Sequence, residues 1–144
     1  MNERKFPALG ERLYEDTLPN GLKIRVVPKM GFARSYAFFA ANYGSMDTRF
    51  RLDGKPYVSP DGVAHYLEHK MFDLPDGNAL QMMSCTGASP NAFTAYHITA
   101  YHFSCTDSFQ ENFELLLRFV SEGYFTQESV EKERGIISQE IKMY

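Results

Sequence analysis

Alternation of apolar and polar positions in the first third of the chain predicts β-strands. Residues 22–28 alternate apolar with charged side chains and follow an Asn20-Gly21 pair, which is a common turn signal. Residues 35–43 are aromatic or small and predict a second, more buried strand. The Asp53-Gly54 pair lies between two further short runs, so a small surface hairpin is expected there.

The middle of the chain combines short helices with a predicted hairpin. Asp61 is a suitable N-cap for a helix over about residues 62–72, and a second short helix is expected over residues 78–84. Residues 91–106 are rich in Thr, Tyr, Phe and Ala, which favours two antiparallel strands that reverse near His97.

Two longer helices are expected in the last third. One begins after Asp107 or Ser108 and runs to about residue 122, with apolar residues at helical spacing. Thr126 caps the other, which continues to the end of the sequence without a Gly or Pro stop signal. Residues 1–144 are therefore expected to be the N-terminal portion of a single domain that is incomplete at its C-terminus. The expected fold class is α+β, an antiparallel sheet with helices packed mainly on one face.

Composition narrows the class of protein. The 144 residues are 44% hydrophobic and 23% charged, which suits one globular domain with its own core. The net charge of −3 argues against a nucleic-acid partner, and the absence of a long apolar run argues against a membrane protein. Two cysteines are too few for a disulfide-stapled secreted scaffold, and the first 21 residues resemble neither a secretory nor a mitochondrial signal. A cytoplasmic location is therefore expected.

The strongest chemical signal is the pentapeptide His65-Tyr66-Leu67-Glu68-His69. On a helix, residues four apart lie on one face, so His65 and His69 can both offer an imidazole to one metal ion. Zinc takes neutral imidazole ligands and, in hydrolytic sites, leaves one position to a water whose pKa it lowers to about 7. Glu68 on the flank of the same face is then a candidate base for that water. The alternative without a metal site is an amphipathic helix whose histidines only pack against neighbours or face solvent.

The last helix offers candidates for a third ligand. Glu133 and Glu140 are two turns apart and share a face with Ile136 and Ile137, so that face is expected to turn inward. Carboxylates on an inward face need a partner, and a metal ion on a neighbouring helix is one. The competing interpretation is a solvated charged face made by the acidic and basic residues of this helix. His97 or His102 in the hairpin could also replace Glu140 as a ligand.

Three segments together resemble the pitrilysin family of inverzincin zinc metallopeptidases, which includes insulin-degrading enzyme and the mitochondrial processing peptidase. They are HYLEHKMF at residues 65–72, GASPNAFT at residues 87–94 and ERGIISQEI at residues 133–141. LPNGL at residues 18–22 and the strand end at residues 43–45 also resemble the first strands of that family. The resemblance spans most of the chain, in the family's order and approximate spacing.

The resemblance implies a specific site. One Zn²⁺ per chain would be bound by His65, His69 and Glu140, with Glu68 as the base. Glu133 matches a second acidic catalytic position that supports the site without being the principal ligand. An edge strand for extended peptide substrates would be formed by Asn91, Ala92, Phe93 and Thr94.

The function implied is zinc-dependent endopeptidase activity on extended peptides. Family members enclose the substrate between homologous domains that are longer than this chain, so a second homologous domain or partner chain is expected. The chain alone can then bind zinc without being active, and its open sheet edge can pair with another copy. The alternative function is a non-catalytic peptide-binding or partner subunit. The complete set of His65, Glu68, His69 and Glu140 favours the enzyme.

Overall fold

A computed structural model describes residues 1–143, which divide into two compact units, residues 1–33 and residues 34 onward. The first unit is an antiparallel three-stranded sheet in the order β1-β2-β3. Its strands are β1 (Asn2–Phe6), β2 (Glu11–Thr17) and β3 (Lys23–Val26), and a 3-10 turn (Pro7–Leu9) with Gly10 at φ 65° connects the first two. The strand expected at residues 22–28 is confirmed as β3. Strands β1 and β2 were not predicted from the sequence.

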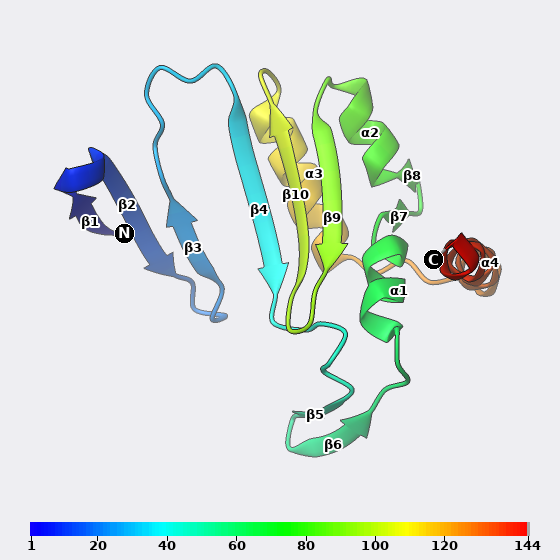
Figure 1. Cartoon of the computed structure of the whole chain (residues 1–144). Helices are drawn as coiled ribbons and strands as arrows, with labels where there is room; N and C mark the ends of the chain where they lie inside the picture. The colour runs from blue at the N-terminus through cyan, green and yellow to red at the C-terminus, as the bar shows by residue number, and fades with distance from the viewer. Residues whose placement is uncertain (144) are drawn as a thin grey trace. The chain divides into compact units, whose positions relative to one another are not determined.

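The second unit is built on an antiparallel sheet in the order β4-β10-β9 (Figure 1). Its strands are β4 (Ser35–Ala41), β9 (Ser89–Thr94) and β10 (Thr99–Cys105), and Tyr101 of β10 pairs with Phe39 on one side and Ala92 on the other. The expected strand at residues 35–43 and the hairpin at residues 91–106 are both confirmed. Two small hairpins join the elements, the expected β5–β6 and a shorter one, β7–β8. Their bounds are β5 Arg49–Leu52, β6 Lys55–Val58, β7 Asp73–Leu74 and β8 Gly77–Asn78.

Three helices pack on one face of this sheet. They are α1 (Val63–Lys70), α2 (Ala79–Cys85) and α3 (Phe109–Ser121). Two of them, α2 and α3, contribute to its hydrophobic core. Tyr101 points from β10 into that core, where its ring lies 5.4 Å from Phe119 of α3 and 5.5 Å from Phe72 after α1. Figure 1 shows α3 crossing one side of the three strands. The expected α+β class, with helices mainly on one face, is confirmed.

The last helix, α4 (Gln127–Met143), packs against α1. Its start follows the expected Thr126 cap, because the Thr126 hydroxyl accepts a hydrogen bond from the Ser129 amide at 3.2 Å. The Ser129 hydroxyl in turn accepts one from the Thr126 amide at 3.1 Å, so two amides of the first turn are satisfied. None of the helices in residues 1–143 is long and apolar enough to cross a membrane.

Two expected caps are wrong. The residue before α1 is Gly62, not Asp61, and no side chain caps that helix. Gly62 has a φ of 83°, a left-handed conformation that glycine adopts without strain, so the chain turns sharply into α1. Ser108 precedes α3 but also has a left-handed φ, 54°, and its hydroxyl makes no cap bond. Both helices depend on tertiary packing more than on capping.

Candidate metal centre

Helix α1 places two imidazoles on one face. His65 and His69 are one helical turn apart, their ring centroids are 4.7 Å apart and the rings are inclined at 81°. Each side chain is about one third exposed, 36% for His65 and 28% for His69. The two rings are therefore close enough to share an ion and are open to solvent on one side.

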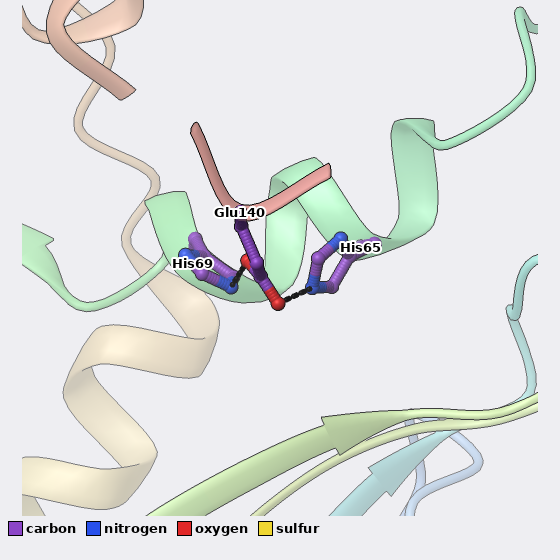
Figure 2. Close-up of side chains that lie close together, drawn as sticks. All are labelled: His65, His69 and Glu140. Carbon is purple, nitrogen blue, oxygen red and sulfur yellow. Dashed lines mark ion pairs between the residues drawn. The ribbon is translucent and has the colours of Figure 1, made fainter. Parts of the chain in front are cut away.

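Helix α4 brings a carboxylate to the same point (Figure 2). Glu140 lies with Oε1 3.9 Å from His65 Nε2 and Oε2 3.6 Å from His69 Nε2. One ligand atom from each of the three residues lies within 4.8 Å of the others. Residues separated by 71 positions in the sequence thus form one cluster, on two helices that pack against each other.

Glu133 contacts the opposite nitrogen of His69. Its Oε1 is 3.0 Å from His69 Nδ1, and Glu133 is only 9% exposed. A carboxylate at that position favours a proton on Nδ1 and leaves the Nε2 lone pair directed toward Glu140 and His65. Glu133 therefore fixes the ring orientation and the tautomer that a metal ligand needs.

A further contact between α1 and α4 comes from Tyr66. Its hydroxyl donates a hydrogen bond to the backbone carbonyl of Val130 at 3.1 Å, so the two helices are joined one turn before Glu133. Burial, and then the negative charge of Glu133, raise the pKa of Tyr66 above its usual value. Tyr66 therefore stays protonated and can donate this bond throughout the neutral range.

Lys70 anchors the segment that leads into α4. Its side chain is fully buried, and Nζ donates hydrogen bonds of 2.9 Å to Asp73 Oδ2 and to the Tyr124 carbonyl. The ammonium also lies over the rings of Tyr124 and Phe125, at 5.8 and 5.6 Å from their centroids. The C-terminal end of α1 is thereby tied to residues just ahead of α4. Neither Tyr66 nor Lys70 was singled out from the sequence, where both are ordinary members of the motif.

Glu68 is buried on the side of α1 that faces the sheet. It is 8% exposed, and its Oε2 accepts a hydrogen bond of 2.7 Å from the hydroxyl of Thr94 at the end of β9. Tyr101 lies on the same side, and its hydroxyl donates to the Leu67 carbonyl at 3.5 Å. Burial, and then the charge of Glu68, raise the pKa of Tyr101 well above its usual value, so its phenol stays neutral.

The segment expected to bind substrate forms the edge strand β9. Among the described residues β9 pairs only with β10, so its outer edge has no strand beside it. Asn91 and Phe93 are exposed, whereas Ala92 and Thr94 alternate with them and are half-buried. Helix α1 lies against this strand. The structure thus places the edge strand next to the helix that carries His65 and His69, while substrate binding there stays a prediction.

His97 and His102, the alternative third ligands left open by the sequence, lie outside the metal cluster. The His97 side chain is 75% exposed and faces Asp47 at 3.4 Å. His102 lies on the sheet face away from the helices, with its ring 5.4 Å from Tyr36. Neither joins His65 and His69 in the cluster described for residues 1–143.

Helix α4 is neither a uniformly solvated charged face nor quite the inward face that was expected. Glu133 is buried and Glu140 half-buried, whereas Lys132 is exposed. Ile137 turns partly inward, but Ile136 is 44% exposed, so its expected inward position is wrong. The inward stripe is narrow because α4 makes its main helix contact with α1 in the described part of the chain.

The donor set fits zinc. Two imidazole nitrogens and one carboxylate oxygen from a single cluster are ligands that Zn²⁺ accepts, at about 2.0–2.2 Å. Three protein ligands with a solvent-exposed side are typical of a hydrolytic zinc site, whereas a structural site is closed by four. The separations of 3.6 and 3.9 Å between the carboxylate oxygens and the imidazole nitrogens leave room for an ion among the three groups.

Comparison with known proteins gives concordant results. The sequence profile described as Insulinase (Peptidase family M16) matches residues 57–144. The uncharacterized zinc protease YmfH of Bacillus subtilis (strain 168) is 49% identical over 142 residues, covering 97% of this chain and 33% of that protein. The chloroplastic stromal processing peptidase of Oryza sativa subsp. indica is 30% identical over 141 residues, covering 92% of this chain and 10% of that protein.

Solved structures agree with this assignment. A protein described as an M16-like peptidase from Alicyclobacillus acidocaldarius superposes with a TM-score of 0.88 at 41% identity, covering 97% of this chain and 32% of that one. Pitrilysin has the same fold, with a TM-score of 0.75 at 22% identity over 92% of this chain and 14% of its own. The chain thus spans about a third of the length of YmfH and less of the longer relatives. This chain belongs to the insulinase family, peptidase family M16.

Proposed function

We propose that this chain carries the metal centre of a zinc-dependent endopeptidase that hydrolyses extended peptides. The observation that carries the proposal is the meeting of His65, His69 and Glu140 within 4.8 Å, on two helices that pack together. The relatives named zinc proteases, at 49% identity and below, support it. In this proposal the three residues hold one Zn²⁺ per chain.

We propose a separate role for each residue of the site. A zinc ion held by His65, His69 and Glu140 would act as a Lewis acid on the peptide carbonyl and would lower the pKa of a bound water to about 7. Glu68 accepts the proton of the attacking water at its carboxylate and later donates it to the departing amine. Glu133 holds His69 through Nδ1, so that the Nε2 lone pair keeps its direction during turnover.

The edge of β9 is the proposed position of the substrate backbone. A peptide that adds as an extra strand satisfies the outward-facing amides and carbonyls of the edge, while side-chain pockets set the preference. Because α1 packs on β9, a peptide on that edge lies beside the helix that carries the base. We propose that Asn91, Ala92, Phe93 and Thr94 contribute this edge.

The proposed activity belongs to a longer assembly. The chain spans about a third of the length of YmfH. Among the described residues, Glu140 forms ion pairs with His65 and His69 and not with a Lys or Arg that could stabilise a developing oxyanion. We propose that a second homologous domain or a partner chain supplies those groups and closes over the substrate.

Removing the metal tests this proposal. The full-length protein is expected to cleave a quenched fluorescent peptide of about ten residues, to lose that activity on treatment with a zinc chelator, and to regain it with about one equivalent of Zn²⁺. Metal content is measured on the same samples. If metal analysis shows that the protein is free of zinc and the peptide is still cleaved, the proposal is contradicted.

A further inference from the structure

The contact between Thr94 and Glu68 joins the proposed substrate strand β9 to the helix α1 that carries the proposed base. Thr94 is the last residue of β9, and its hydroxyl donates a hydrogen bond of 2.7 Å to Glu68 Oε2. Bonds from a hydroxyl to an ionised carboxylate are short and stronger than neutral ones. Glu68 is 8% exposed, so little water is available to compete for that oxygen.

The position of Thr94 makes its hydroxyl a rigid donor. Thr94 pairs with Thr99 across the β9–β10 hairpin, so its backbone is held by the sheet. Threonine is branched at Cβ, which restricts its first side-chain torsion. Glutamate has three rotatable torsions and is mobile unless something fixes its end. The hydrogen bond therefore fixes the flexible Glu68 carboxylate to the conformationally restricted Thr94 side chain.

We propose that Thr94 is a positioning residue for the base: it holds Glu68 Oε2 and so leaves Oε1 to receive the proton. This inference rests on the proposed function. It also changes the expected role of Thr94, whose side chain serves the base and not the substrate. Since β9 is the strand proposed to bind the peptide, one strand sets the position of both the substrate backbone and the group that activates water.

Steady-state kinetics on the full-length protein test this role. Thr94→Val removes the hydroxyl at nearly constant volume and is expected to lower kcat by about 10- to 100-fold, the usual effect of losing a group that orients an active-site residue. KM and zinc content are expected to stay unchanged. Thr94→Ser keeps the hydroxyl and is expected to recover most of kcat. If the valine variant does not fold, Thr94→Ala removes the same hydroxyl without the second methyl group.

Thr99→Val is the matched control. Thr99 is the cross-strand partner of Thr94 and is 5% exposed, and its hydroxyl donates to the Tyr43 carbonyl at 2.8 Å and not to Glu68. Its loss is expected to lower the midpoint of thermal unfolding and to leave kcat of the folded protein unchanged. An equal loss of kcat in this control would show that Thr94 acts only through strand stability.

Two results would overturn the inference. Unchanged kinetics in the folded Thr94→Val or Thr94→Ala variant would show that Glu68 needs no anchor. A raised KM at constant kcat would assign Thr94 to substrate contact. Glu68→Gln is measured in parallel. If this variant also cleaves the peptide normally, the proposed function is contradicted. If it is inactive while the Thr94 variant is unaffected, only the positioning role of Thr94 is contradicted.

Discussion

Glu68→Gln in the full-length protein is expected to retain zinc and to lose peptide cleavage. The amide cannot accept a proton from water, and general acid–base catalysis contributes about 10²- to 10⁴-fold in rate. We therefore expect kcat to fall by at least about a hundredfold. Glutamine is nearly isosteric with glutamate, and its carbonyl can still accept the hydrogen bond from Thr94, so the fold and the ligands should be preserved.

The control for this substitution is an acidic residue on the surface. Glu131 is exposed on α4 and accepts a hydrogen bond only from the neighbouring Gln127 side chain in the described structure. Glu131→Gln makes the same chemical change and should leave both zinc content and kcat unaltered. Undiminished cleavage in the Glu68→Gln variant would remove the base from the mechanism.

Among the substitutions proposed for this chain, Lys70→Ala is expected to lower the free energy of unfolding the most. Lys70 is fully buried, and its ammonium joins Asp73 to the Tyr124 carbonyl. Removing one partner of a buried ion pair costs about 3–5 kcal/mol. The Asp73 side chain is 31% exposed and is partly hydrated, so we expect the free energy of unfolding to fall by about 3 kcal/mol, the lower end of that range.

Urea unfolding of the zinc-free chain measures this effect without a contribution from metal binding. Lys70→Met is the informative companion, because it removes the charge but fills the buried space, and it should cost less than alanine. Lys132→Ala, on the exposed surface of α4, should change stability by no more than about 0.5 kcal/mol. A Lys70→Ala variant as stable as the unchanged chain would show that this anchor does not hold the α1–α4 arrangement.

The elements that could be predicted are those with a local signal. Helix α1 coincides with the metal motif, and α4 begins after a threonine whose hydroxyl accepts an amide of the first turn. The β9–β10 hairpin was predicted from its β-branched and aromatic residues. In each case the short-range preference and the tertiary environment agree.

The elements that were missed lack such a signal. β1 is exposed at every position and reads as a charged segment, so it has no apolar face from which a strand can be inferred. The predicted Asp61 cap is wrong because Gly62 occupies the N-cap position, where its left-handed backbone turns the chain into α1. Turn geometry of this kind outweighs the preference for an acidic cap.

The site likewise combines features with a local sequence signal and features that depend on tertiary packing. The i, i+4 spacing of His65 and His69 predicts a shared face from the helix repeat alone. The distance from that face to Glu140 depends on how α4 packs against α1, which the sequence does not state. The burial of Lys70 could not be predicted either, because lysine is almost never fully buried unless a tertiary partner is available.

The central claim is that His65, His69 and Glu140 hold one zinc ion, and zinc content per chain tests it most directly. We predict one zinc per unchanged chain, none retained after dialysis in His65→Ala or Glu140→Gln, and binding weakened by only about 10- to 100-fold in Glu133→Gln, where the ligands remain but His69 is less well oriented. Stoichiometric zinc that survives Glu140→Gln but is lost in Glu133→Gln would contradict the account.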